Sequence, residues 1–412
     1  MSKKQIFTPT DILLPKLSEK DMEAWAVVAC DQFSSEKDYW ERVCNLVGDR
    51  PSTFKMIIPE AYLEEVDQQA ETQKICDEMQ KYLNSGVLEV TKESFVYVER
   101  TQPDGRVRKG VVGAVDLEEY DFTGAASAIR ASEGTALDRL PPRVAVRRVA
   151  PLELPHIITF IDDQEKTVIE PLSNIADSLP TLYDFALMEG GGHIKGKKVT
   201  GIHAQKVMET LNALHEKSDM LMIMGDGNHS LAAAKVYWDE IKQNLSESER
   251  ESHPARKAIL EMSNVYDPAI DFEAIHRVIF NTDVTTFIAE FTKAMPKGSD
   301  YSIKWTTASG SGEIGITADC IGDLYAVMQD FVDEFVERKA GVIDYIHGDD
   351  TTIALAKQEG AVGLILPAMD KSEFFETVTK RGVFPRKSFS VGHARDKRYY
   401  LECRKIDCRQ TP

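Results

Sequence analysis

The stretch MLMIMGDGNHSLAAAK, residues 220–235, is the part of the sequence that best defines the fold. Five consecutive apolar residues lead into a short polar turn with two glycines, and helix-favouring residues follow. An unbroken apolar run is typical of a strand covered on both faces, and glycine lets a turn adopt positive φ. The stretch therefore predicts a buried strand, a tight loop and a helix that continues to Trp238.

The turn itself is a candidate site for an anion. A loop at the start of a helix presents backbone N–H groups and the positive end of the helix dipole, which favour a phosphate group. The amides and side chains that would form this phosphate-binding loop belong to Gly225, Gly227, Asn228 and Ser230. The sequence is not a Walker A motif, because the Gly-Lys-Ser/Thr ending is absent, and it is not a full Rossmann fingerprint.

Asp226 and His229 add ionisable groups to the same turn. A carboxylate can bind a metal ion and an imidazole can move a proton, so both residues are candidate catalytic groups, with Asp226 also the candidate metal ligand. The alternative is an ordinary structural connection. In that interpretation Asn228 or Ser230 is the N-cap of the helix, and Asp226 accepts hydrogen bonds from loop amides.

Composition limits the classes of function. The chain has 412 residues, of which 42% are hydrophobic and 28% charged, as in a folded protein outside the membrane. The sequence contains no apolar run of membrane-spanning length, and its start lacks the apolar core of a signal peptide, so we expect a cytoplasmic protein. The net charge of −18 argues against nucleic acid or anionic lipid as a partner. Six scattered cysteines predict reduced thiols; Cys30 is either reactive or, more in keeping with its apolar strand, structural.

Positive charge is nevertheless concentrated in two segments. Residues 380–409 contain ten Lys or Arg against three Asp or Glu, a local charge of +7. Residues 130–148 contain five arginines against two acids. Such segments suit a small anionic ligand, and they equally suit the neutralisation of acidic groups elsewhere in the fold.

The remaining patterns predict a mixed α/β (α+β) architecture, because strands and helices are interleaved unevenly. A surface helix is expected at 63–83 and a β-hairpin at 95–100 and 106–115. Further strands are expected at 144–149, 156–161, 342–346, 362–366 and 398–404, and further helices at 204–217, 324–336, 352–358 and 371–379. We place a core that includes the polar turn at residues 1–280 and a C-terminal α/β lobe with a basic tail at 281–412.

Three other motifs combine cations with hydrogen-bonding groups. His276 and Arg277 are adjacent in an apolar, strand-like segment, so one of them can face a site while the other packs. Arg386, Lys387 and Ser388 follow a proline and are good phosphate-binding material, although they also suit a surface loop. Arg130 and Glu133 have the spacing of one helical turn, which would bring them together as an ion pair.

Taken in order, these motifs resemble the family known as domain of unknown function 1015. The resemblance rests on WAVVACDQ at 25–32, IRASEGT at 129–135, the turn at 225–230, IHR at 275–277 and RKS at 386–388. The family's usual loop reads Asp-Gly-His-His-Arg, whereas this chain has Asn228 and Ser230 at the third and fifth positions. The loop is also similar, more distantly, to those of the ParB and sulfiredoxin-like superfamily. That similarity implies a core of this type with additional elements, and relatives that include free-serine kinases.

The combined interpretation is a nucleotide-dependent phosphotransferase that acts on a small hydroxyl-bearing metabolite such as free serine, with ADP or ATP and Mg²⁺ as the expected cofactors. His229 would donate to the transferred phosphoryl group, and Glu133 or Asp226 would act as the general base. The groups expected to bind or neutralise phosphate are Arg130, His276, Arg277, Arg386, Lys387 and Ser388, beside the loop amides. The alternative is a non-catalytic regulatory protein that binds a nucleotide or phosphometabolite with the same loop.

Overall fold

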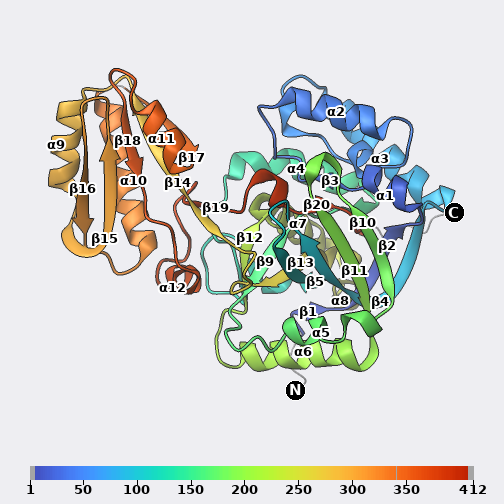
Figure 1. Cartoon of the computed structure of the whole chain (residues 1–412). Helices are drawn as coiled ribbons and strands as arrows, with labels where there is room; N and C mark the ends of the chain where they lie inside the picture. Colours follow the sequence, from blue (N-terminus) through green and yellow to red (C-terminus); the bar gives the residue numbers. More distant parts are fainter. Residues whose placement is uncertain (1–4, 340, 407–412) are drawn as a thin grey trace. The chain divides into compact units, whose positions relative to one another are not determined.

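The computed structural model describes residues 5–339 and 341–406. The chain forms two compact units (Figure 1). Unit 1 comprises the described parts of Met1–Ala131, Thr135–Ile270 and His393–Pro412, and unit 2 comprises Ser132–Gly134 and Asp271–Gly392. Strands and helices are mixed in both units, so the expected mixed α/β class is confirmed. The division between residues 280 and 281 stays a prediction.

Unit 1 is built on one large sheet. Along the sheet the strands follow the order β10 (Thr181–Ala186), β11 (His193–Val199), β4 (Leu88–Thr101), β5 (Val107–Asp116), β13 (Lys257–Asn264), β9 (Ile158–Ile161), β12 (Met222–Asp226), β7 (Ile129–Arg130) and β6 (Tyr120–Asp121). β1 (Phe7–Thr8) pairs with β5, and β2 (Thr10–Pro15) pairs with β4. The antiparallel pairing of β4 with β5 confirms the predicted hairpin.

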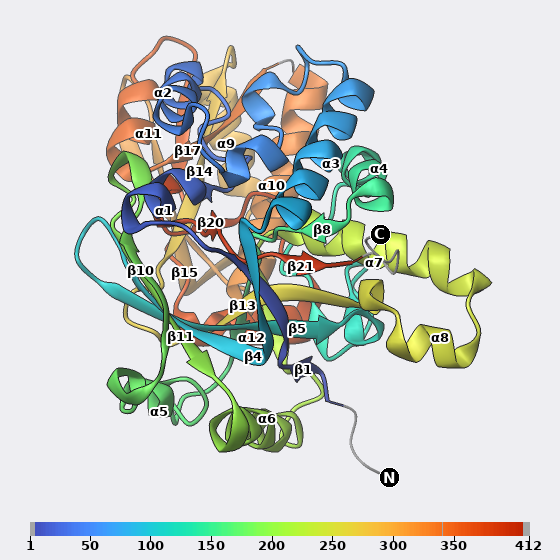
Figure 2. The same cartoon turned by 90° about the vertical axis from the view of Figure 1, so that its right-hand side faces the viewer.

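The sheet is covered on both faces, which explains its long apolar runs. Along β4, Phe95 and Tyr97 belong to one hydrophobic cluster, whereas Val96 and Val98 belong to another, because successive side chains of a strand point to opposite faces. Figure 2 shows helices on the two sides of this layer. The helices of unit 1 are α1 (Glu19–Trp25), α2 (Lys37–Val47), α3 (Gln68–Ser85), α4 (Leu140–Val149), α5 (Glu170–Ser173), α6 (Gly201–His215), α7 (Asn228–Ile241) and α8 (Glu247–Ser252).

The strand predicted at 144–149 is wrong, because these residues form the second half of α4. Pro141 and Pro142 lie in the first turn of that helix, where a missing backbone N–H breaks no intrahelical hydrogen bond. Leu140 and Val144 are buried against the small side chains of α7. Burial of this one helical face outweighs the strand preference of the valines.

The last described residues complete unit 1. Only parts of the strand predicted at 398–404 are present, as β20 (Tyr399–Tyr400) and β21 (Arg404–Lys405). β20 pairs with β3 (Val27–Val28), and β21 pairs with β8 (Leu152–Glu153). Residues 407–409 of the basic segment lie outside the described residues.

Unit 2 has a sheet of its own. The strand order is β16 (Ser311–Ile316), β15 (Lys297–Thr306), β18 (Val362–Ile365), β14 (Phe272–Phe280) and β17 (Val342–His347), with β19 (Phe389–Val391) beside β14. Its helices are α9 (Val284–Ala294), α10 (Ile321–Lys339), α11 (Asp349–Leu355) and α12 (Lys371–Arg381). The strands and helices predicted in this region are confirmed, with ends that differ by a few residues.

Candidate functional site in unit 1

The predicted strand, loop and helix at 220–238 are present as β12, the turn at Gly227 and α7. Gly225 is required by packing, because a Cβ atom there would lie 2.4 Å from Cε2 of Phe160. Gly227 has a φ of 81° and is the N-cap of α7, which no side chain caps. The expectation that Asn228 or Ser230 is the N-cap is therefore wrong: both lie within the first turn of α7, where the positive end of the helix dipole is located.

The two carboxylate oxygens of Asp226 differ in their contacts: one accepts a hydrogen bond within the turn, and the other has no hydrogen-bond partner. Its Oδ1 atom accepts a hydrogen bond of 2.8 Å from the N–H of Gly227, as the structural alternative predicted. Its Oδ2 atom is buried and has no hydrogen-bond partner, although Nζ of Lys397 lies 3.4 Å away. A carboxylate oxygen with an unused acceptor position can accept a hydrogen bond from a ligand or contact a metal ion.

The surroundings of His229 favour its neutral form. Its Nε2 atom accepts a hydrogen bond of 3.3 Å from the N–H of Ala136. Burial lowers the pKa of His229, and the positive charges of Arg143 and Arg139 lower it further. The neutral ring with an accepting Nε2 carries its proton on Nδ1, so Nδ1–H is the group that can donate to a ligand.

A second carboxylate, Asp31, belongs to the same charged cluster. Burial alone would raise the pKa of Asp31, but its interactions with His156 and Lys397 lower that pKa, so Asp31 is ionised at neutral pH. Asp31 and Asp226 therefore both interact with Lys397. Asp31, His156 and Lys397 are not among the site residues that the sequence predicted. The available signal was the position of Asp31 directly after the apolar run Trp25–Cys30.

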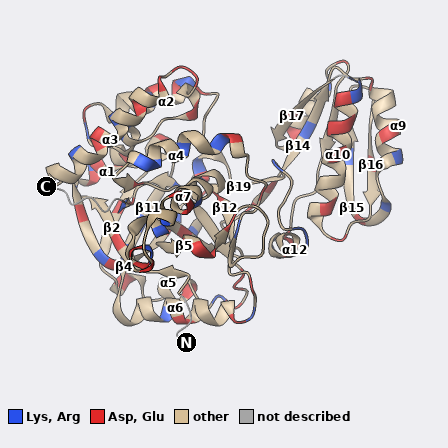
Figure 3. Cartoon of the chain, turned by 180° about the vertical axis from the view of Figure 1, so that it is seen from behind, with Lys and Arg blue, Asp and Glu red and all other residues tan. Residues whose placement is uncertain are grey.

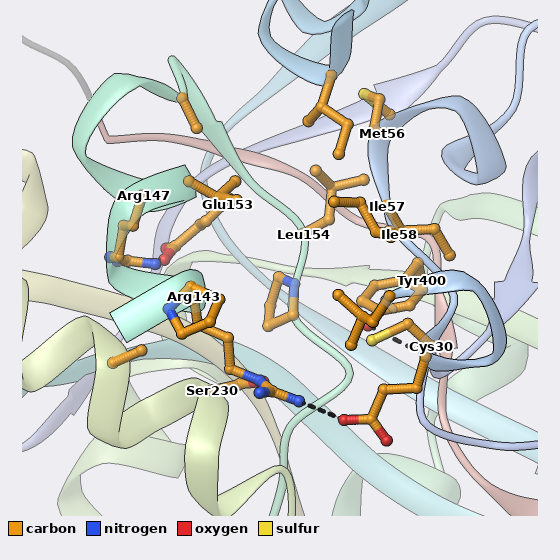
Figure 4. Close-up of a pocket in the computed structure, with 18 of the residues that line it drawn as sticks. Cys30, Met56, Ile57, Ile58, Arg143, Arg147, Glu153, Leu154, Ser230 and Tyr400 are labelled. Carbon is orange, nitrogen blue, oxygen red and sulfur yellow. Dashed lines mark hydrogen bonds and ion pairs between the residues drawn. The ribbon is translucent and has the colours of Figure 1, made fainter. Parts of the chain in front are cut away.

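A cavity of about 860 Å³ lies in unit 1 and includes Ser230, from the first turn of α7, in its wall. Figure 4 shows Met56, Ile57, Ile58 and Leu154 on one side of it and Arg143 with Ser230 on another. The wall is thus largely apolar, with charged groups confined to part of it.

The charged groups of this wall are mostly paired. Arg143 and Arg147 come from α4, whose cations are visible in Figure 3, and they pair with Glu60 at 2.9 Å and with Glu153 at 2.6 Å. Cys30 also lines the cavity, and burial raises the pKa of its thiol to about 12. That thiol is protonated at neutral pH, which favours the structural interpretation of Cys30 over the reactive one.

Arg130 lies in unit 1, in a strand and not in the helical turn that its spacing from Glu133 suggested. Ile129 and Arg130 form β7, which pairs in parallel with β6 and β12, so the predicted helical turn is wrong. The Nε atom of Arg130 donates to the carbonyl of Ser127 at 3.0 Å.

Three of the predicted phosphate-binding residues, Arg277, Lys387 and Ser388, lie in unit 2, as does Glu133, which was predicted as a general base. Glu133 accepts a hydrogen bond of 3.3 Å from the N–H of Ser388, and Arg277 and Lys387 both lie near the ring of Tyr345. The roles predicted for this group remain predictions.

His276 and Arg386 differ from that group. In His276, Nε2 lies 2.8 Å from a carboxylate oxygen of Asp349, and Nδ1 accepts from the N–H of Leu366 at 3.1 Å. Both ring nitrogens thus have partners within unit 2, whereas the side chain of Arg386 is exposed.

The described residues contain no group of three or more His, Cys, Asp or Glu side chains arranged to hold a metal ion. Within the same residues, no helix has the length and apolarity needed to span a membrane.

The family described as "Protein of unknown function (DUF1015)" matches residues 15–403, nearly the whole chain. This chain belongs to the DUF1015 family. The resemblance inferred from the motifs is thereby confirmed. No curated protein matches this DUF1015 member.

Several solved structures are similar to this DUF1015 protein at low sequence identity. A conserved hypothetical protein from Pyrococcus furiosus is 11% identical, with 71% of this chain and 94% of that chain covered and a TM-score of 0.37. SbnI from Staphylococcus aureus, truncated at its C-terminus, is 9% identical, with 68% and 82% covered and a TM-score of 0.36. A free serine kinase in complex with AMP is 10% identical, with 70% and 90% covered and a TM-score of 0.38. These values are too low to transfer a ligand or a residue role.

Proposed function

We propose that the protein is a nucleotide-dependent phosphotransferase that acts on a small hydroxyl-bearing metabolite, with its phosphate-binding loop at the start of α7. The observation that carries this proposal is the grouping of Asp226, His229 and Lys397 around a helix start that no side chain caps. The amide end of the helix and the Lys397 ammonium group supply positive charge, and Asp226 supplies a carboxylate oxygen that lacks a hydrogen-bond partner.

Each group has a distinct role in the proposed reaction. The amides of Asn228 and His229 and the ammonium group of Lys397 bind phosphate oxygens. The Nδ1–H of His229 donates to the transferred phosphoryl group. Asp31, which is ionised, accepts the proton of the acceptor hydroxyl. The hydroxyl oxygen forms a bond to the terminal phosphorus of the nucleotide, the bond from that phosphorus to its bridging oxygen breaks, and the nucleotide leaves with one phosphate fewer. Phosphoryl transfer requires mainly positioning and charge stabilisation, and this set provides both.

Asp226 also fits a magnesium ion. Mg²⁺ commonly uses one or two protein carboxylates together with phosphate oxygens and water, so a cluster of three protein ligands is not required. The Oδ2 atom of Asp226, which has no hydrogen-bond partner but forms an ion pair with Lys397 at 3.4 Å, would be the protein ligand. A bound Mg²⁺ would supply neutralisation of phosphate charge at this position.

The cavity is suited to the organic part of the nucleotide. Its volume of about 860 Å³ lies within the range of small-molecule pockets, and its apolar wall suits a nucleobase better than a free amino acid. Because Ser230 belongs both to the cavity wall and to the first turn of α7, one ligand can occupy the two places.

The test is calorimetric titration of the full chain with ADP and ATP, with and without Mg²⁺, followed by turnover assays with a panel of hydroxyl-bearing metabolites. We expect magnesium-dependent binding that is weakened at least about tenfold in Asp226→Asn, in which the amide oxygen still accepts from Gly227. The matched control is Asp219→Asn, an exposed aspartate just before β12, which should bind like the wild type.

His229→Gln completes the test, because glutamine retains an acceptor for the Ala136 amide. If His229→Gln binds the nucleotide but has lost turnover, the result supports the role assigned to His229. Tight magnesium-independent binding without turnover of any metabolite favours the regulatory alternative. No heat with any nucleotide contradicts the proposal, and unfolding of Asp226→Asn would show that the turn is structural.

A further inference from the structure

Arg277 of β14 is a fully buried cation that lacks an ion-pair partner. Its side chain is 0% exposed. Nε donates to Oε1 of Gln329 at 2.7 Å and Nη1 donates to the carbonyl of Ile275, but Nη2 is buried without any hydrogen-bond partner. Among the described residues, no carboxylate lies within ion-pair distance of this guanidinium group, although the charges of Glu133 and Asp333 act on it from farther away. A buried charge with an unused donor is costly, so the position calls for an explanation.

A second cation lies near the same aromatic ring. Tyr345 of β17 is the register partner of Arg277, whose Cζ atom lies 4.6 Å from the centre of the tyrosine ring. Nζ of Lys387 lies 5.8 Å from the centre of that ring. Tyr345 is half-buried and Lys387 is exposed, so the pair of cations extends from the interior of unit 2 to solvent.

The backbone around Lys387 is also unusual. Lys387 has a φ of 60°, in the left-handed region that residues other than glycine adopt at a cost. The next residue, Ser388, donates its N–H to Glu133, and its hydroxyl donates to the carbonyl of Pro385 at 2.7 Å. Local hydrogen bonds thus hold the segment in the conformation that places Lys387 near Tyr345.

We propose that unit 2 contains its own anion-binding site, in which Arg277 and Lys387 bind one phosphate group of a small molecule beside Tyr345. The phosphate would supply the acceptor that Nη2 of Arg277 lacks, and Lys387 would contact it from the solvent side as a mobile point charge. The ring of Tyr345 would limit the direction of approach. This site does not depend on the proposed function of unit 1, because all of its groups belong to unit 2.

The experiment titrates the full chain with inorganic phosphate by calorimetry, with sodium chloride of equal ionic strength as the reference. We expect the affinity for phosphate at this site to fall at least about tenfold in Lys387→Met and in Arg277→Met. Arg386→Met is the matched control, because Arg386 is an exposed cation one residue before Lys387 and should leave the affinity unchanged.

The outcomes separate the two proposals. Phosphate binding that is lost in Lys387→Met but kept in Asp226→Asn supports the site in unit 2. Binding that Lys387→Met leaves intact overturns it, whatever happens to nucleotide binding in unit 1. Equal losses in Lys387→Met and Arg386→Met would also overturn it, since they would indicate a general effect of surface charge. If Arg277→Met does not fold, the comparison of phosphate binding in Lys387→Met and Arg386→Met still tests the proposed site.

Discussion

Arg398 and Arg404 of unit 1 and Arg277 of unit 2 are all buried, but only the first two are in contact with carboxylates. In unit 1, Arg398 contacts Glu261 at 2.8 Å and Glu402 at 2.6 Å, and Arg404 contacts Glu153 at 2.6 Å. In unit 2, the guanidinium of Arg277 has an aromatic ring and an amide oxygen as neighbours instead. Part of the basic C-terminal segment therefore neutralises buried acids of the fold, whereas the buried cation of unit 2 has no ion-pair partner and is the centre of the proposed anion site.

Replacement of Arg398 should cause the largest loss in the free energy of unfolding. Arg398→Met leaves Glu261 and Glu402 buried with less compensating charge, and loss of one partner of a buried ion pair costs about 3–5 kcal/mol. Urea unfolding of the purified variant measures this loss. The control is Arg148→Met, whose pair with Glu240 is exposed and should contribute about 0–1 kcal/mol. Equal losses in the two variants would contradict a special role for the buried network.

Arg277→Met should have a much smaller effect on the free energy of unfolding. The substitution removes a hydrogen bond to Gln329, but it also removes a desolvated charge that has no ion-pair partner, so we expect a net change within about 1 kcal/mol. The same urea experiment in phosphate-free buffer measures it. A loss as large as that of Arg398→Met would show that the two units use buried arginine in the same way.

The smallest expected effect is a change in how the stability of the protein depends on pH when His229 is replaced by glutamine. Burial lowers the pKa of His229 in unit 1 below the ordinary histidine value of about 6.5, and burial also lowers the pKa of His276 in unit 2. The folded state then binds fewer protons than the unfolded state just below pH 6.5, so stability present above that pH is lost as the pH falls. Unfolding curves at pH 7.5, 6.5 and 5.5 should show a smaller loss in His229→Gln than in the wild type. An unchanged slope would contradict the inferred direction.

The sequence predicted those parts of the fold that depend on local pattern. The run at 220–224 identified β12 because both faces of the sheet are covered, and the turn at 225–230 followed from its glycines. The helix α4 was predicted as a strand, because valines favour strands and the packing of Leu140 and Val144 against α7 is a tertiary effect.

The charged cluster was harder to predict because its members are distant in the sequence. Asp31, His156 and Lys397 come from three separate segments, and no spacing rule connects them. The basic segment allowed two explanations, and only the contacts with Glu261 and Glu153 show that Arg398 and Arg404 serve the fold.

The return of the chain to unit 1 has a consequence for biosynthesis. The indole of Trp25 donates to the carbonyl of Leu401, 376 residues later, and β3 has its described partner in β20. On the ribosome, these contacts of the N-terminal part of unit 1 can therefore form only after almost the whole chain has been synthesised. Residues 271–392 are continuous in the sequence and can fold during translation. A nascent chain should therefore contain this part of unit 2 in folded form while unit 1 is still incomplete.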